Sequence, residues 1–100
     1  MPGYRFSRLA RLDLIEIAEY TLGQWGLGQA EHYLDRLDDC FKRLVQNPRM
    51  GRVCDSIRAG YRRIEHEKHV VIYRVDESEV FICRILHKGM LPRKHLFEDS

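Results

Sequence analysis

The sequence has few cysteines and no long apolar run. Its 100 residues include three cysteines, which are far apart and form no Cys-x-x-Cys pair, so neither a disulfide framework nor a metal site is expected. No segment reaches the roughly 20 apolar residues that cross a bilayer, and the N-terminus lacks the apolar run of a signal peptide. We therefore expect a cytoplasmic protein. Cys40 and Cys83 occupy positions of the apolar pattern, which predicts that both are small core residues.

Several motifs of catalysis and nucleotide binding are also missing. The sequence contains no Walker loop, no Gly-x-Gly-x-x-Gly and no His-Glu-x-x-His, so nucleotide binding and zinc-peptidase chemistry have no basis. Ser7 and Ser56 have no evident histidine and acid companions, which argues against a serine hydrolase. We expect no cofactor.

The composition is that of one ordinary folded domain. The chain is 44% hydrophobic and 32% charged, and a domain over residues 1–100 buries roughly two-thirds of its unfolded surface. The net charge is only +2, but arginines gather near the start, in the middle and at the end, whereas acids follow the expected helices. Two interpretations stay open: a basic face that meets nucleic acid or an acidic protein segment, and a mixed solvated surface.

The N-terminal part predicts a short strand followed by a helix. Tyr4-Arg5-Phe6 is an extended entry that can add to a sheet as an edge strand. Ser7 is a suitable helix N-cap, because its hydroxyl can accept a hydrogen bond from an N–H one turn later. Apolar residues then recur at steps of three and four from Arg8 onward, and the helix is expected to end near Leu22-Gly23.

A second helix follows a glycine-rich turn at Gly26 and Gly28. Trp25, beside this turn, is expected to be a packing residue rather than a stacking platform. The second helix has the clearest apolar stripe of the chain, which predicts burial against the sheet and the first helix. The stripe consists of Ala30, Tyr33, Leu34, Leu37, Cys40, Phe41 and Leu44. Asn47-Pro48 ends the helix, because proline disfavours a helical conformation at the residue before it.

Three β-branched and aromatic runs predict an antiparallel meander: Arg58–Glu65, His69–Val75 and Glu79–His87. The last two runs are apolar at both alternating sets of positions, so both of their faces must be covered. Residues 49–57 are expected to form a loop, and Arg93–Phe97 a short C-terminal helix. The fold class is therefore α+β, with an N-terminal helical hairpin packed on a small antiparallel sheet.

Arginine inside the strand runs indicates buried pairs or partner contacts. Arg62 and Arg63 are adjacent, so they must point to opposite faces. One of them is expected to pair with a helix carboxylate such as Asp13 or Glu16. The other is either an edge charge that discourages aggregation or a contact for an acidic partner.

His87 is the best-placed histidine, because it ends a strand beside Arg84 and Lys88. One interpretation is acid–base cleavage of a phosphodiester, in which neighbouring cations stabilise the developing charge. The favoured interpretation is a hydrogen bond that caps the strand end. His66 and His69 flank a hairpin turn and are expected to lie in solvent.

An ordered set of short segments runs through most of the chain. These segments are Tyr20-Thr21 with Trp25-Gly26, Gln29-Ala30 with Tyr33, Asn47-Pro48 with Gly51-Arg52, Ile57-Arg58 with Gly60-Tyr61-Arg62-Arg63, His69-Val70-Val71-Ile72-Tyr73-Arg74-Val75, and Arg84-Ile85-Leu86-His87 with Met90 and His95-Leu96. From about Tyr4 to Leu96 the chain resembles the ParE toxins of type II toxin–antitoxin modules, in the RelE/ParE superfamily. The fold of that superfamily, a helical hairpin on a small antiparallel sheet, matches the one argued above.

The resemblance implies a toxin that inhibits DNA gyrase without being an enzyme and that is neutralised by a ParD-like antitoxin. We expect contacts between acidic residues of the antitoxin and three arginines, Arg62, Arg63 and Arg74. Gyrase contacts are assigned to Lys88, Arg93, Lys94 and His95. We expect no membrane contact, and contact with nucleic acid only through the antitoxin complex.

The RelE branch of the superfamily supplies the main alternative, a ribosome-dependent mRNA endonuclease. Its members carry a tyrosine or histidine near the C-terminus as acid or base. Here no tyrosine follows Tyr73, and His87 with Arg84 would have to serve instead. A third possibility is a toxin-derived binding module without activity.

Overall fold

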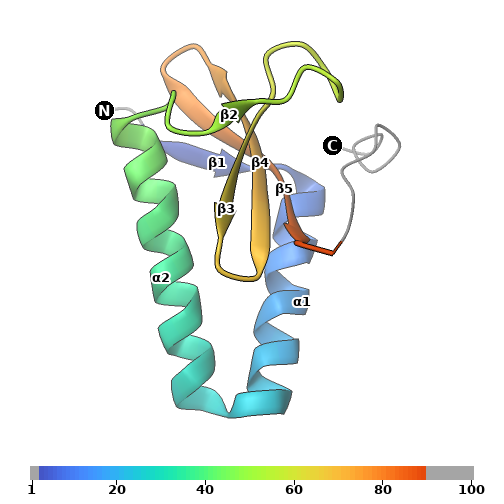
Figure 1. The fold of residues 1–100 in the computed structure, drawn as a ribbon. Helices are drawn as coiled ribbons and strands as arrows, with labels where there is room; N and C mark the ends of the chain where they lie inside the picture. Colours follow the sequence, from blue (N-terminus) through green and yellow to red (C-terminus); the bar gives the residue numbers. More distant parts are fainter. Residues whose placement is uncertain (1–2, 90–100) are drawn as a thin grey trace.

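The computed structural model describes residues 3–89, and two helices pack on a five-stranded sheet (Figure 1). The elements are β1 (Tyr4–Phe6), α1 (Arg8–Trp25), α2 (Leu27–Gln46), β2 (Arg52–Val53), β3 (Arg62–His66), β4 (His69–Asp76) and β5 (Glu79–His87). The strand order is β1-β5-β4-β3-β2, antiparallel except for the parallel β1–β5 pair. The α+β prediction is confirmed. The predicted C-terminal helix, Arg93–Phe97, lies outside the described residues.

Ser7 starts α1 and also fastens it to the sheet. Its hydroxyl oxygen accepts a hydrogen bond from the Ala10 N–H at 3.0 Å, which confirms the predicted N-cap. The same hydroxyl donates to the Cys83 carbonyl at 2.7 Å, and the Ser7 N–H donates to the Ile82 carbonyl at 2.9 Å. One serine therefore fixes where α1 leaves the edge of β5.

The helical hairpin turns at a single residue, Gly26. The predicted end of the first helix near Leu22-Gly23 is wrong, because α1 continues to Trp25. Gly26 has a φ of 89°, a left-handed conformation that glycine adopts without steric cost. Its N–H donates to the Leu22 carbonyl, and its carbonyl accepts from the Ala30 N–H. Gly28, which was also expected in the turn, lies inside α2.

The predicted stripe of α2 forms the centre of the main core. Leu37, Cys40, Phe41 and Leu44 are almost completely buried, and the helix ends at Gln46 just before Asn47-Pro48 as predicted. The α2 stripe meets Val71, Tyr73, Val80 and Ile82 of the sheet and Ala10 and Ile17 of α1.

The first strand of the meander begins four residues later than predicted, at Arg62. The chain before it folds into a loop, closed by a hydrogen bond from the Cys54 N–H to the Tyr61 carbonyl at 2.7 Å. Gly60, with a φ of 88°, makes the turn. The segment expected to be entirely loop also contains β2, whose two residues pair with β3.

Both faces of β4 are covered, as the sequence required. Val71 and Tyr73 face the helices, whereas Val70 and Ile72 join a second core with Cys54, Ile57, Tyr61, Cys83 and Leu86. The loop before β3 therefore covers one face of β4, and the helical hairpin covers the other. Burial of Cys40 and Cys83 confirms their predicted role as core residues. Within residues 3–89, no helix is both long and apolar enough to span a membrane.

Candidate partner-binding groove

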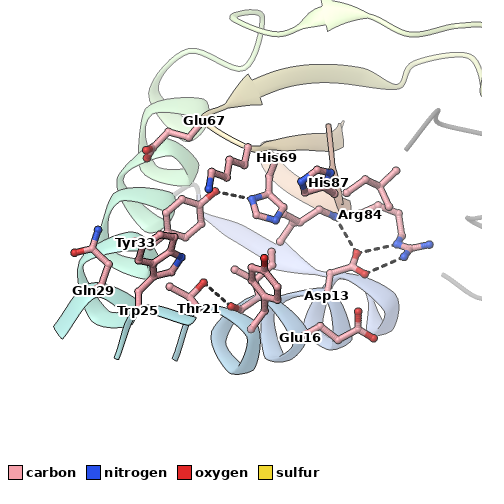
Figure 2. A pocket seen from close by; sticks show the side chains of 15 residues that line it. Asp13, Glu16, Thr21, Trp25, Gln29, Tyr33, Glu67, His69, Arg84 and His87 are labelled. Atoms are coloured by element: carbon pink, nitrogen blue, oxygen red, sulfur yellow. Dashed lines mark hydrogen bonds and ion pairs between the residues drawn. The ribbon is translucent and has the colours of Figure 1, made fainter. Parts of the chain in front are cut away.

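A cavity of about 690 Å³ lies between the helical hairpin and one end of the sheet (Figure 2). In Figure 1, α1 and α2 diverge from the Gly26 link, and the turn between β3 and β4 points into the space between them. The lining residues are Asp13, Glu16, Ile17, Tyr20, Thr21, Trp25, Gln29, Tyr33, Glu67, Lys68, His69, Arg84, Ile85, Leu86 and His87. We call this cavity the hairpin groove.

Asp13 and Arg84 form a buried ion pair in the wall of the hairpin groove. The Asp13 carboxylate accepts from Arg84 Nε at 2.8 Å, from Arg84 Nη2 at 2.9 Å and from the Ile85 N–H at 2.9 Å. The Asp13 hydrogen bond raises the pKa of Arg84. A carboxylate with three donors is well satisfied despite its burial, so this pair locks α1 onto β5.

Arg62 or Arg63 was predicted to pair with a helix carboxylate such as Asp13 or Glu16, and this prediction is wrong. Helix α1 packs on β5, whereas both arginines belong to β3, which is separated from β5 by β4. The spacing of Asp13 with Ala10 and Ile17 on the buried face of α1 was a signal that Asp13 needs a buried cation.

Tyr33 and His69 connect α2 to the start of β4. The Tyr33 hydroxyl lies 2.5 Å from His69 Nδ1. Burial raises the pKa of Tyr33 to about 12 and lowers the pKa of His69 to about 4. Near pH 7 the Tyr33 hydroxyl is therefore protonated and donates a hydrogen bond to Nδ1 of a neutral His69 imidazole. The hydrogen of that imidazole is then on Nε2.

Three histidines form a row across the sheet. His66 pairs with His69 in the β3–β4 register, and His69 pairs with His87 in the β4–β5 register. The side chain of His66 is only 10% exposed, and burial lowers its pKa. The prediction that His66 and His69 lie in solvent is thus wrong, because Tyr33 of α2 covers their hairpin.

His87 ends the row at the surface. Its Nδ1 accepts a hydrogen bond from the Gly89 N–H at 3.1 Å, as the capping interpretation predicted. Its ring centroid lies 5.9 Å from that of His69 in an edge-on arrangement. Among residues 3–89, no group of three or more His, Cys, Asp or Glu side chains is arranged to hold a metal ion.

Aromatic side chains form the outer rim of the hairpin groove. Trp25 is 63% exposed and Tyr20 is 66% exposed, and the Lys68 ammonium lies 5.9 Å from the Trp25 ring centroid. The prediction that Trp25 is a packing residue is wrong. Trp25 is the last residue of α1, and this end of the helical hairpin extends beyond the sheet (Figure 1). Tyr20 and Tyr33 also line the groove, although neither was among the predicted site residues.

The arginines assigned to the antitoxin do not form one cluster. Arg62 donates to the Gly51 carbonyl at 2.8 Å, and Arg63 lies 3.6 Å from a Glu65 carboxylate oxygen. Arg62 is opposite Tyr73 and Arg63 opposite Ile72, so the two project to opposite faces of the sheet as predicted.

The remaining assigned cations lie elsewhere. Arg74 stacks over the Phe81 ring at 4.3 Å on the face that carries the second core. Lys88 lies 3.4 Å from a Glu65 carboxylate oxygen. Arg93, Lys94 and His95 are outside the described residues. The partner contacts assigned to all these residues stay predictions.

Comparison with known proteins gives a consistent picture. Residues 4–92 match the family model described as the ParE toxin of the type II toxin–antitoxin system parDE. Toxin ParE1 of Caulobacter vibrioides is 42% identical over 96 residues, covering 96% of this chain and 99% of the relative. Toxin ParE1 of Mycobacterium tuberculosis is 42% identical over 88 residues, covering 87% and 90%.

Two solved structures resemble the fold. A chain from the chromosomal ParDE TA system of P. aeruginosa superimposes with a TM-score of 0.74 at 25% identity, over 87% of this chain and 96% of that chain. A chain of the toxin–antitoxin complex RelBE2 from Mycobacterium tuberculosis gives a TM-score of 0.63 at 24% identity, over 88% and 100%.

Proposed function

The chain belongs to the ParE family of type II toxins, and we propose that it inhibits DNA gyrase, blocks replication and is neutralised by a ParD-like antitoxin. The match over nearly the whole chain supports the toxin role. The hairpin groove, with aromatic side chains on its rim, supports a role in holding a protein partner. The expected place of action is the cytoplasm.

The Asp13–Arg84 pair is the observation that most favours binding over catalysis. In the nuclease alternative, Arg84 would have to stabilise a phosphate, but its guanidinium already makes two short hydrogen bonds to a buried carboxylate. His69 has a pKa of about 4, which leaves it unprotonated near pH 7 and unsuited to act as a general acid. A binding function needs surface complementarity rather than a proton-transfer group.

A gyrase assay tests the proposed function. Purified chain is expected to inhibit ATP-dependent supercoiling or to trap cleaved DNA, and to leave ribosome-bound mRNA intact. His87→Ala should keep most of the activity. Reversal of the basic charges at Lys88, Arg93 and Lys94 should weaken it, because a gyrase contact is spread over several residues. Codon-phased mRNA cuts that disappear with His87→Ala would instead place this protein with the RelE nucleases.

The hairpin groove is the proposed binding site of the antitoxin. A disordered antitoxin tail that folds as a helix could bury the exposed rings of Tyr20 and Trp25. Its acidic residues could continue toward the sheet arginines.

Co-purification of this chain with the C-terminal fragment of the protein encoded by the adjacent gene tests this binding site. Trp25→Ala should weaken capture by about tenfold or more, as expected for a buried aromatic anchor. Val53→Ala is the matched control, because Val53 is 57% exposed and lies in β2, away from the groove. Equal capture by both variants would exclude the groove as the binding site.

A further inference from the structure

His69 and His87 lie next to each other in the strand wall of the hairpin groove. They are directly opposite each other in the β4–β5 register, which places both side chains on the same face of the sheet. Both line the groove, and Figure 2 shows the two rings at the edge of the cavity. Two polar rings in this arrangement can contact one group of a bound partner together. We call them the histidine pair.

The hydrogen bonds of the two rings determine where each ring carries its hydrogen. Nδ1 of His87 accepts from the Gly89 N–H at 3.1 Å, and a backbone N–H can only donate. Nδ1 of His69 accepts from the Tyr33 hydroxyl, which is 2.5 Å away. A neutral imidazole has one N–H and one acceptor nitrogen, so both rings of the histidine pair carry their hydrogen on Nε2.

Both Nε2–H groups are available to donate to a partner in the groove. Among residues 3–89, neither Nε2 atom has a hydrogen-bond partner. His87 is an exposed residue. Nε2 of His69 is open to solvent, whereas Nε2 of His66 is buried without a partner. The strand wall of the groove therefore presents two unused N–H donors side by side.

Three acids also line the groove, and none of them uses these two donors. The Asp13 carboxylate already accepts three other hydrogen bonds. A Glu67 carboxylate oxygen lies 3.1 Å from the Arg36 guanidinium. Glu16 points away from the histidine pair (Figure 2). An acceptor for the two donors must therefore come from outside the groove.

We propose that the histidine pair binds a carboxylate from an acidic side chain of the partner helix, and so helps to select the antitoxin that the groove accepts. Lys68, which precedes His69 and also lines the groove, adds a positive charge to the same wall. Hydrogen bonds to a charged acceptor are stronger than those between neutral groups. A partner without this acceptor would bury two unpaired donors, which is costly. This inference rests on the proposed antitoxin site in the groove.

The first measurement needs no partner. Long-range ¹H–¹⁵N NMR of the native chain at about pH 7.5, where an ordinary histidine is neutral, distinguishes the two forms of each ring. Both His69 and His87 are expected to carry their hydrogen on Nε2. A hydrogen on Nδ1 of either ring would overturn the proposal.

The second measurement is isothermal titration of the chain with the C-terminal fragment of the protein encoded by the adjacent gene. His87→Phe keeps an aromatic ring but removes the donor, and it should weaken binding by about tenfold or more. His87→Gln should lose less, because its amide can still donate. His32→Phe is the matched control, since it makes the same change at an exposed position of α2 outside the groove, and it should bind like the native chain.

Circular dichroism checks that each of these variants keeps its helices. Equal affinities of His87→Phe and the native chain would overturn the proposal.

The third measurement identifies the carboxylate. Each Asp or Glu of the fragment is replaced in turn by Asn or Gln. One replacement should weaken binding to the native chain by about tenfold and have little further effect on His87→Phe, because both changes remove the same interaction. Acids that all act independently of His87 would overturn the proposal.

Trp25→Ala separates this inference from the antitoxin site itself. If Trp25→Ala weakens binding of the fragment but no acid is coupled to His87, only the role of the histidine pair fails. If the fragment does not bind, or binds Trp25→Ala as tightly as the native chain, the groove fails as the antitoxin site and the inference fails with it. The supercoiling assay is independent of both results.

Discussion

The two helices of one hairpin bury their apolar residues in opposite ways. In α2 the apolar residues form one stripe, and the buried members Leu37, Phe41 and Leu44 all face the main core. In α1 they lie on both sides, so that Ala10 and Ile17 are buried while Leu12 and Ile15 are exposed. The difference shows that the buried apolar residues of α2 form a single stripe, whereas α1 also carries apolar residues that folding leaves exposed.

Burial on the inner face of α1 is also more polar than that of α2. Ser7 and Asp13 satisfy backbone groups of β5 beyond the short β1 pairing. The contacts of α2 with the core are largely those of apolar and aromatic side chains. The two helices should therefore respond differently to substitution, temperature and pH.

The largest effect is expected for Phe41→Ala in α2. The side chain is 2% exposed and packs against the rings of Tyr4 and Phe6. Loss of the ring should lower the free energy of unfolding by about 3–5 kcal/mol, measured by urea denaturation. Ile15→Ala is the control and should cost much less, because Ile15 is 54% exposed on α1. Equal losses would remove the distinction between the helices.

Asp13→Asn tests the polar attachment of α1. The amide cannot accept all three hydrogen bonds of the carboxylate, and it leaves Arg84 without its buried counter-charge. We expect the free energy of unfolding to fall by about 2–3 kcal/mol, again in urea. Glu16→Gln, an exposed acid one turn along α1, should change it little. A stability loss no greater than that of Glu16→Gln would mean that the pair does not hold α1 on β5.

The Tyr33–His69 contact makes the attachment of α2 sensitive to pH. The folded chain has a His69 pKa of about 4, compared with 6.5 for an ordinary histidine, so the unfolded chain binds more protons between these values. The contribution of His69 to the free energy of unfolding is therefore constant above pH 6.5, and it falls as the pH decreases from 6.5 toward 4. Because solvent screens the half-buried ring, we expect a loss of about 1–2 kcal/mol.

Denaturation curves at several pH values measure this loss. His69→Gln, which can still accept from Tyr33, should flatten the pH dependence. His32→Gln, at an exposed position of α2, should leave it unchanged. An unaltered slope in the His69 variant would assign the pH dependence to other groups, such as His66.

The smallest effect on stability is expected at Leu12 and Ile15, two exposed apolar positions of α1. Leu12→Gln combined with Ile15→Gln should change the free energy of unfolding by less than about 0.5 kcal/mol per site, as is usual for exposed positions. A large loss of stability in thermal denaturation would show that Leu12 and Ile15 contribute to the fold.

Local pattern was sufficient for most of the fold. The N-cap at Ser7, the stripe around Phe41 and the stop at Asn47-Pro48 each depend on neighbours within a few residues, and all three are confirmed. The paired coverage of β4 also followed from its two apolar faces. Two boundaries were wrong. The late start of β3 depends on the folding of the preceding loop, in which Cys54 bonds to Tyr61, and α1 continues past Gly23 to Trp25 because the hairpin turns at Gly26 instead.

Most features of the hairpin groove did not follow from pattern. Asp13 was predicted to pair with Arg62 or Arg63, whereas its partner is Arg84. The partner depends on which strand α1 packs against. His69 was expected in solvent, although Tyr33, which is 36 positions away in sequence, covers it. Trp25 was expected to be a packing residue, but it is 63% exposed at the end of α1.

By itself, the sequence determined both helices, the strands other than β2, the buried stripe of α2 and the resemblance to ParE toxins, since periodicity, caps and breakers are encoded in short stretches of chain. Only the tertiary structure decided the Asp13–Arg84 pair, the covering of His66 and His69 by Tyr33, and the exposure of Trp25. Each of these depends on which surfaces meet, and the meeting of residues far apart in the chain is set by the packing of whole helices and strands.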